Sequence, residues 1–513
     1  MSKLKQQKNI SRRSFLKGAT VVGGGILVPS YAPAQASRVG GNLNVSIPAL
    51  MEIFDPATHN KQEEALVLNN LYETLTWINT DHVLGPMIAE SWEPSDDLTA
   101  WTFKLREGVT FHNGQAMTAD DVVFTIKRIL DPETASSGRD DLAMVGEVTA
   151  VDTNTVRIDL EFAYADIPAI LADAKFSIVP NDPGIMANLV SRPVGTGPFM
   201  FDSYTPGGDF VMVRNPKYHG PPAILDSVTL KFIPETAARV ISLKNAETDI
   251  LWQIDYAVFD ELNEATGIRV RDISTESWDP LVMDVRKPPF DNPMVRQAVR
   301  YAIDKDELIK LALFGHGVKV PFPLSPQNPL FPADLPNVPF DIPKAKQLLT
   351  DAGYPDGFET PLYLGIGRPV RVAEGIVIAQ MLKAVNIICD VQQVPLDVFF
   401  NDIEFKGEFY TTGWRGEPSA DGQIYPRFHS KGSWNVAHWS NSEVDELLDQ
   451  SRRTASIEER RELYTRVGEI VNEDGPYMIA WVANRADAWR SEVLGFEPHP
   501  MNFMYFRDVA MRV

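Results

Sequence analysis

The alternation of apolar and polar positions predicts β-structure in the first half of the chain. Residues 101–114, WTFKLREGVTFHNG, alternate in polarity and end in a His-Asn-Gly turn sequence. Residues 148–162 alternate around an Asp-Thr-Asn sequence, which indicates a hairpin. Between these stretches, Thr118 precedes an acidic first turn and a helical run, a pattern typical of a capped helix. Strands and helices are therefore expected to alternate along this part of the chain.

Helical periodicity is stronger in the second half. Residues 294–315 are predicted to form a pair of amphipathic helices, with apolar side chains repeating on one face. Residues 360–391 predict a strand, a helix and a second strand in succession. Two further amphipathic helices are predicted at 442–454 and 456–474. This order predicts an α/β protein in which mixed sheets are flanked by helices.

One stretch, Thr411–Ser430, follows neither period. Its sequence, TTGWRGEPSADGQIYPRFHS, places charged and aromatic side chains among glycines and prolines, which indicates irregular backbone. Loops held by a rigid scaffold often carry binding groups, and a large aromatic residue such as Trp414 is costly to leave in water. The stretch therefore favours a ligand site over a solvated surface loop.

Size and charge limit the classes of protein to which the chain can belong. At 513 residues it exceeds the size that one hydrophobic core supports, so two or more lobes are expected. The net charge of -21 disfavours binding to a nucleic-acid backbone, which requires clustered Lys and Arg. The single cysteine, Cys389, excludes a disulfide within the chain and a multi-cysteine metal site.

Motifs of catalysis and cofactor binding are missing from the sequence. The 8 histidines do not adopt metal-ligand spacing. No nucleophile elbow, phosphate-binding loop or dinucleotide fingerprint occurs. The sequence therefore gives no positive support for a catalytic residue, a bound metal, a cofactor or an enzyme, and a catalytic dyad of residues distant in the sequence stays an open alternative.

Residues 1–36 have the layout of an export signal. They carry several Lys and Arg and no acidic residue, and an apolar, glycine-rich stretch follows that is too short to span a membrane. Ser11–Lys17, SRRSFLK, resembles the twin-arginine signal, which implies export of the folded protein by the twin-arginine translocase. The small-residue pattern that ends at Ala36 predicts cleavage there. We therefore expect the mature protein in the periplasm.

Six stretches in sequence order resemble the solute-binding proteins of ABC importers. The resemblance is to the large class that serves dipeptides, oligopeptides and nickel, the bacterial extracellular solute-binding proteins of family 5. Among the matching motifs are RPVGTGPF and TGWRGEPSADG. The stretches cover most of the expected mature chain and are Ala89–Gly114, Arg192–Phe199, Asn215–Ile250, Arg286–Ile309, Asp341–Phe358 and Thr412–Ser433.

The resemblance implies a two-lobed periplasmic binding protein of type II with an extra subdomain. The first lobe would contain residues 37–284 and 488–513, with the subdomain inserted at 76–190, and the second lobe would contain residues 285–487. Hinges are then expected near Asp284–Lys287 and near Asn484–Ala488. Ligand would bind between the lobes and stabilise their closed arrangement. The expected partners are the ABC permease subunits with their cytoplasmic ATPase, and the protein is expected to be a monomer.

Members of the family also imply roles for charged residues after the Gly-Trp pair. In peptide-binding members, an aspartate after this pair contacts the α-ammonium of the ligand, and Glu417 stands at that spacing here. Alternatively, Arg415 neutralises Glu417 and the pair is structural. Other relatives carry Gly-Trp-x-Gly-Arg-Pro-Asp-Pro-Asp-Gly, against which Ser419 replaces the first aspartate and Asp421 keeps the second.

The remaining candidates for ligand contact lie elsewhere in the chain. Trp414 would stack on the ligand, cover a cationic group or fill the lobe core. Trp278 precedes the first expected hinge and is expected to face the cleft. Arg368 is the candidate for a ligand carboxylate, with Arg371 second, and a solvated surface arginine is the alternative. His59 would line the cleft or end a turn.

These observations predict the periplasmic substrate-binding component of an ABC importer. The expected ligand is a peptide or a peptide-like zwitterion. Within the same class, an opine, an amino-acid conjugate, a glycoside or a nickel chelate remains an alternative. A secreted hydrolase or a structural interaction protein is the alternative from a different class.

Overall fold

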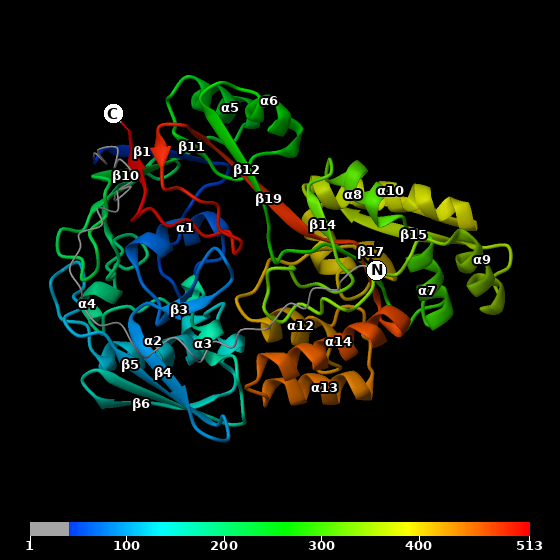
Figure 1. Ribbon diagram of the computed structural model, residues 1–513, viewed down its shortest axis with the longest axis horizontal. Coiled ribbons are helices and arrows are strands. Elements are labelled where there is room, and N and C mark those ends of the chain that lie inside the picture. The colour runs from blue at the N-terminus through cyan, green and yellow to red at the C-terminus, as the bar shows by residue number, and fades with distance from the viewer. Residues whose placement is uncertain (1–39, 513) are drawn as a thin grey trace, which may run out of the picture. The chain divides into compact units, whose positions relative to one another are not determined.

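The computed structural model of the chain describes residues 40–512 (Figure 1). The predicted signal sequence and its cleavage site at Ala36 lie outside the described residues. Helices and strands are mixed, and the three larger sheets have eight, five and four strands. The predicted α/β class is confirmed. Within residues 40–512, no helix has the length and apolar character that crossing a membrane requires.

The eight-stranded sheet forms the centre of what we call the first lobe. Its strand order is β12-β19-β11-β1-β10-β9-β8, and β14 pairs with β19. Strand β1 runs parallel to β10 over its whole length, and its Leu43, Val45 and Ile47 are completely buried. Helix α1 (Gln62–Leu71) packs its apolar residues into the same core. The strands are β1 (Asn42–Ile47), β8 (Phe199–Tyr204), β9 (Phe210–Arg214), β10 (Ser227–Phe232), β11 (Ile250–Leu251), β12 (Ile268–Ser274), β14 (Gly317–Lys319) and β19 (Trp481–Arg490).

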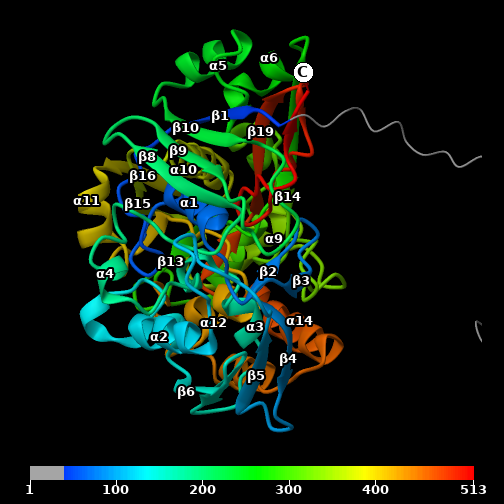
Figure 2. The same cartoon turned by 90° about the vertical axis from the view of Figure 1, so that its left-hand side faces the viewer.

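A subdomain with its own core is inserted in the first lobe. Its antiparallel sheet has the order β4-β5-β7-β6, and helix α2 (Ala119–Leu130) packs against β6 and β7 (Figure 2). The predicted hairpin at 148–162 is confirmed. The predicted helix after Thr118 is also confirmed, and the backbone N–H of Thr118 donates to the Asp121 carboxylate at 2.8 Å. The strands of this part are β2 (Thr76–Ile78), β3 (Leu84–Pro86), β4 (Ala89–Pro94), β5 (Ala100–Leu105), β6 (Val145–Asp152) and β7 (Thr155–Leu160).

The five-stranded sheet forms the centre of the second lobe. Its order is β16-β15-β17-β13-β18, and the parallel strands β15 and β16 are joined through helix α10 (Pro369–Leu382), which confirms the predicted strand-helix-strand unit. The strands are β13 (Pro280–Met283), β15 (Phe358–Gly365), β16 (Ile387–Val394), β17 (Phe409–Thr411) and β18 (Tyr477–Ile479). The other long helices are α7 (Pro293–Tyr301), α8 (Lys305–Ala312), α9 (Ile342–Asp351), α12 (Ala420–Phe428), α13 (Ser442–Arg452) and α14 (Ile457–Asp474).

Apart from the short strand β14, which pairs with the start of β19, the chain changes sheet twice. It leaves the first lobe after β12 and enters the second at β13, so the first crossing segment is 275–279, and it returns between β18 and β19 (Figure 1). Asp284, at the first expected hinge, donates its backbone N–H to the Glu408 carbonyl within the second lobe at 2.9 Å. The changes of sheet thus lie a few residues before the expected hinges. The hinge positions and the lobe boundaries themselves stay predictions.

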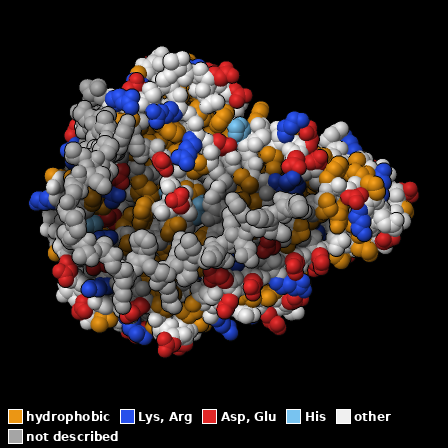
Figure 3. All heavy atoms as spheres, viewed as in Figure 1, with side chains coloured by type: hydrophobic (Ala, Val, Ile, Leu, Met, Phe, Trp, Pro, Cys, Tyr) orange, Lys and Arg blue, Asp and Glu red, His pale blue; other side chains and the backbone are white. Residues whose placement is uncertain are grey.

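The described surface carries charges of both signs. Figure 3 shows acidic and basic side chains interspersed over the visible face, with apolar side chains between them. Such mixing is typical of a solvent-exposed surface. The groups that can select a ligand are found in cavities of the molecule instead.

Candidate ligand cleft

Residues of both lobes enclose a cavity of about 660 Å³. This volume lies in the range of small-molecule sites. The first lobe contributes the start of helix α1 and Gln253, and the second lobe contributes the crossing segment and several loops. We call this cavity the cleft, and its charged and aromatic lining residues are Lys61, Glu63, Asp279, Arg368, Arg371, Phe400, Glu404, Trp414, Arg415 and Trp434.

The Gly-Trp-Arg-Gly motif is shaped by the first crossing segment. Trp414 and Trp278 form an isolated antiparallel β-bridge, with N–O distances of 3.0 and 3.1 Å. A Cβ atom on Gly413 would lie 1.9 Å from Asp279 Oδ1, and one on Gly416 would lie 2.4 Å from the Glu276 Cβ. Gly416 is therefore required because the backbone of the crossing segment packs directly against it, whereas a side chain at Gly413 would have to displace the ends of the Asp279 and Arg371 side chains.

Arg368 and Arg371 both line the cleft, but only Arg371 is paired. Arg371 Nε lies 2.9 Å from Asp279 Oδ1, and both side chains are largely buried. The exposed Arg368 side chain makes no hydrogen bond or ion pair with any residue in 40–512. Partial burial, and next the nearby Arg371 charge, lower the pKa of Arg368 from its ordinary value. Arg368 is thus a cation in the cleft that an anionic ligand group can pair with.

Two aromatic side chains that the sequence did not single out line the cleft. Phe400 is 46% exposed and Trp434 is 43% exposed. Phe400 belongs to the π-helical turn Phe399–Ile403, and such turns are frequent at functional sites. Because large aromatic groups are costly to leave in water, these two indicate an apolar surface that a ligand covers. In the sequence, the pair Phe399-Phe400 before Asn401 and Asp402 was the feature that could have pointed to Phe400 as a binding residue.

Trp414 reaches the cleft, whereas Trp278 lies behind it. Trp414 is 8% exposed, lines the cleft and lies under the Arg427 guanidinium, whose centre is 5.3 Å from the ring. Trp278 is completely buried, with its ring 4.7 Å from that of Trp414 and 6.0 Å from that of Tyr477. The predicted ligand contact of Trp278 gains no support from this position, and that of Trp414 stays open.

Glu417 and Arg415 form a pair with each other. Glu417 Oε1 lies 3.6 Å from Arg415 Nε and 4.0 Å from Arg427 Nη2. The Glu417 carboxylate is the main cause that raises the pKa of Arg415. Glu417 lines a separate small cavity between the lobes and not the cleft. This geometry favours the structural alternative, and the contact of Glu417 with a ligand ammonium remains untested.

Asp421 and His59 also have partners within the protein. Asp421 is buried and receives two hydrogen bonds from Arg452, at 2.9 and 3.0 Å. His59 is buried, its Nδ1 lies 2.8 Å from the Pro56 carbonyl, and burial lowers its pKa. Neither residue lines the cleft. Of the two alternatives for His59, its position agrees with the one in which it ends a turn.

The lobes also contact each other outside the cleft. Asp166 of the first lobe receives two hydrogen bonds from Arg460 on α14, both at 2.6 Å. Nearby, the Tyr164 hydroxyl donates to Asp421 at 2.5 Å, and the Ala165 N–H donates to the Arg452 carbonyl at 2.8 Å. These contacts hold the two lobes together without touching the cleft.

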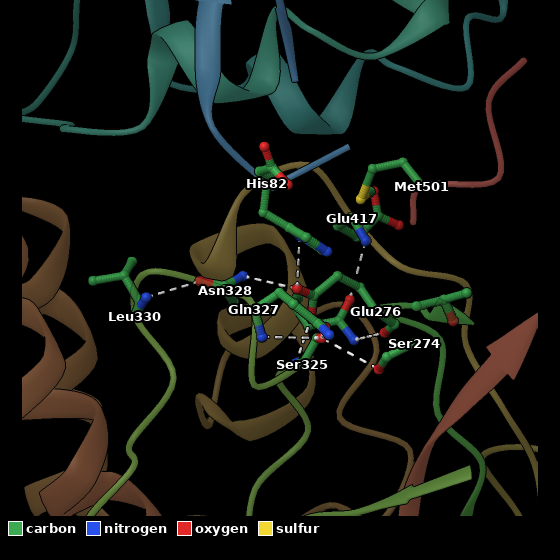
Figure 4. A network of polar contacts seen from close by, with 12 residues as sticks. His82, Ser274, Glu276, Ser325, Gln327, Asn328, Leu330, Glu417 and Met501 are labelled. Carbon is green, nitrogen blue, oxygen red and sulfur yellow. Dashed lines mark hydrogen bonds and ion pairs between the residues drawn. The ribbon is translucent and has the colours of Figure 1, made fainter. Parts of the chain in front are cut away.

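A buried carboxyl group in the first crossing segment joins the two lobes. Glu276 is 1% exposed and accepts hydrogen bonds from the Ser325 N–H at 2.9 Å and from the Asn328 side chain at 3.1 Å (Figure 4). His82, from the β2–β3 turn of the first lobe, points at the same carboxyl group, with Nδ1 at 3.3 Å. Burial raises the pKa of Glu276 to about 7 and lowers that of His82 to about 4.

The described residues contain no group of three or more His, Cys, Asp or Glu side chains arranged to hold a metal ion. The cleft offers charged groups and exposed aromatic side chains for recognition. Its arrangement can bind and enclose a solute that carries an anionic group and an apolar group.

Known proteins resemble the chain over most of its length. The profile of the family described as bacterial extracellular solute-binding proteins, family 5 Middle, matches residues 83–435. Heme-binding protein A of Haemophilus influenzae is 31% identical over 468 residues, which are 83% of this chain and 84% of that protein. Glutathione-binding protein GsiB of Escherichia coli K12 is 27% identical over 497 residues, 93% of this chain and 96% of that protein.

A solved structure shares the fold. The periplasmic binding protein DppA of Helicobacter pylori, associated with an ABC transporter and solved in complex with the peptide STSA, is similar with a TM-score of 0.78. The two chains are 26% identical, and the similarity covers 93% of this chain and 99% of that one.

Proposed function

The chain belongs to the bacterial extracellular solute-binding proteins of family 5, and we propose that it captures a peptide-like solute with a carboxylate and an apolar side chain. Its fold is the two-lobed type II fold of periplasmic binding proteins. As the substrate-binding component of an ABC importer, it takes up solute between the lobes. It then delivers the solute, as a monomer in a closed form, to the permease subunits that the cytoplasmic ATPase drives.

The observation that carries the proposed ligand is the cation Arg368 beside exposed aromatic groups. Arg368 offers a planar donor group to a carboxylate. Phe400 and Trp434 offer apolar surface in the same cleft. The peptide complex of the Helicobacter pylori relative supports a peptide-like ligand. Because Glu417 is paired with Arg415, recognition of the ligand carboxylate should dominate over recognition of its ammonium group.

The proposal is tested with a dipeptide and its amide. Isothermal titration of the mature protein with Leu-Phe should give saturable binding without consumption of the peptide. Leu-Phe amide, which lacks the carboxylate, should bind at least tenfold more weakly. Arg368→Gln should weaken Leu-Phe binding by at least tenfold, about 1.4 kcal/mol, and leave the amide unaffected.

The matched control is Arg192→Gln, which removes an exposed arginine outside the cleft and should bind Leu-Phe normally. Equal affinity for peptide and amide would contradict the carboxylate contact. Turnover of the peptide would instead indicate a hydrolase. Mass spectrometry of the protein purified from its native host identifies the natural ligand, including an opine, a glycoside or a nickel chelate.

We also propose that the protein reaches the periplasm through the twin-arginine translocase. The motif SRRSFLK at Ser11–Lys17 supports this route. Replacement of Arg12 and Arg13 by lysine should leave the uncleaved precursor in the cytoplasm, as cell fractionation and immunoblotting would show. Continued export of the double variant would point to the general secretory route.

A further inference from the structure

A second cavity, of about 250 Å³, lies entirely within the first lobe. Helix α1 connects it to the cleft: Gln62 and Glu63 at the start of the helix line the cleft, and Asn69 near its end lines the second cavity. The β2–β3 hairpin and the segment 505–508 form other walls, and Figure 2 shows β2 and β3 near one another below α1. The cavity is thus separate from the proposed solute site.

Flat apolar groups form the sides of this cavity. Trp77, Tyr218 and Tyr505 line it, and each of these side chains is only partly buried. The Trp77 and Tyr505 rings meet edge to face, with centroids 5.6 Å apart. A Cβ atom on Gly85 would lie 2.9 Å from Trp77 Nε1, so the indole is packed against backbone and its position is fixed. These walls suit a planar apolar group.

The acidic group of the cavity is already engaged. Glu73 is 3% exposed and receives a hydrogen bond from the Tyr218 hydroxyl at 2.8 Å. Its other oxygen lies 2.8 Å from His219 Nε2. The Asp508 carboxylate is paired with Arg507. The acidic groups are therefore occupied and do not call for a cationic ligand.

Hydrogen-bond donors, in contrast, are in excess. Asn69 is 8% exposed, and its side-chain Nδ2 has no hydrogen-bond partner among the described residues. Arg106 Nε donates to the Met87 carbonyl, while its terminal nitrogens donate to no residue in 40–512. The guanidinium end of the partly buried Arg106 therefore favours a ligand that accepts hydrogen bonds.

We propose that this cavity binds a small carboxylate with a planar apolar body. The carboxylate pairs with Arg106, and the planar body lies against the Trp77–Tyr505 pair and Tyr218. Since α1 lines both cavities, a ligand here also contacts the element that forms one wall of the cleft.

The test uses trans-cinnamate and its uncharged amide, cinnamamide, as probes on the mature protein. With the cleft saturated by Leu-Phe, isothermal titration should give one saturable site for cinnamate and at least tenfold weaker binding of cinnamamide. Arg106→Gln should weaken cinnamate binding at least tenfold, whereas the cleft variant Arg368→Gln and the surface variant Arg192→Gln should leave it unchanged. Trp77→Phe should reduce the change in tryptophan fluorescence that cinnamate causes.

Two results would overturn the proposal. One is the absence of saturable cinnamate binding, or equal affinity for the amide, in the wild-type protein, which needs no variant to fold. The other is loss of cinnamate binding in Arg368→Gln but not in Arg106→Gln, because this would place the probe in the cleft. Neither result bears on the binding of Leu-Phe, so the solute-binding function is tested separately.

Discussion

Asp166→Asn is expected to weaken binding of the cleft ligand by at least tenfold, although Asp166 lies outside the cleft. Asp166 accepts two hydrogen bonds from Arg460 across the lobes, and the two side chains are 10% and 6% exposed. When the lobes part, both groups become hydrated, so the pair stabilises only the closed arrangement. Since ligand binds in the closed form, a smaller closed population lowers the apparent affinity in proportion.

The size of the effect follows from burial. Removal of one partner leaves the Arg460 charge buried without compensation, a change that costs roughly 3–5 kcal/mol in fully buried pairs. A tenfold loss of affinity corresponds to about 1.4 kcal/mol, which is less than the cost of a buried unpaired charge, so the expected tenfold loss is a lower bound. Isothermal titration with the dipeptide measures it.

The matched control is Asp159→Asn, which breaks an exposed ion pair with Arg157 inside the subdomain and should leave affinity unchanged. Small-angle scattering of the ligand-free Asp166→Asn protein should show a more open average form. Unchanged affinity in this variant, together with an unchanged scattering profile, would rule out a role for the pair in closure.

Local patterns predicted the elements that depend on neighbours in sequence. The β6–β7 hairpin and the capped helix α2 are determined by alternation, a turn sequence and a capping residue within a few positions. The unit of β15, α10 and β16 is likewise local. Arg368, Arg371 and Trp414, candidates for ligand contact from the sequence, line the cleft, and their contact with a ligand stays a prediction.

Side-chain direction could not be predicted in the same way. Glu417 has the expected spacing after Gly-Trp, but it pairs with Arg415 and Arg427 and does not line the cleft. Asp166 and Arg460 are 294 residues apart, so no local pattern reports their contact. Phe400 lies on a π-helical turn, which has neither the α-helical nor the β period.

Glu276 is expected to make ligand binding weaker as pH rises from about 6 to about 8. In the closed form, burial raises the pKa of Glu276 to about 7. Opening withdraws His82 and admits water, so the pKa in the open form falls toward the ordinary glutamate value. Closure then takes up a proton between these two values. Its contribution is therefore fully present below the open-form pKa and is lost as pH rises through about 7.

The neighbouring ionisable groups do not reverse this direction. In the closed form, burial lowers the pKa values of His82 and His499 to about 4 and about 3, so both are neutral there. Opening hydrates His82 and returns its pKa toward the ordinary value near 6.5, so below that pH the open form gains a proton at His82, which offsets part of the Glu276 contribution. The other partners of Glu276 are uncharged, namely Ser325, Asn328 and Gln423. Burial also lowers the pKa of Lys305 to about 7. Its ammonium group donates a hydrogen bond to the Val320 carbonyl within the second lobe, so its titration affects unfolding rather than closure.

The variant Glu276→Gln keeps the shape of the side chain and removes the titration. Wild-type protein should bind the dipeptide roughly two- to threefold more weakly at pH 8.0 than at pH 6.0, because His82 offsets part of the Glu276 contribution. Glu276→Gln should lose this weakening, whereas the exposed control Glu107→Gln should keep the wild-type dependence. Isothermal titration in buffers of matched ionic strength measures all three. A weakening with rising pH that persists in Glu276→Gln would assign the proton to another group.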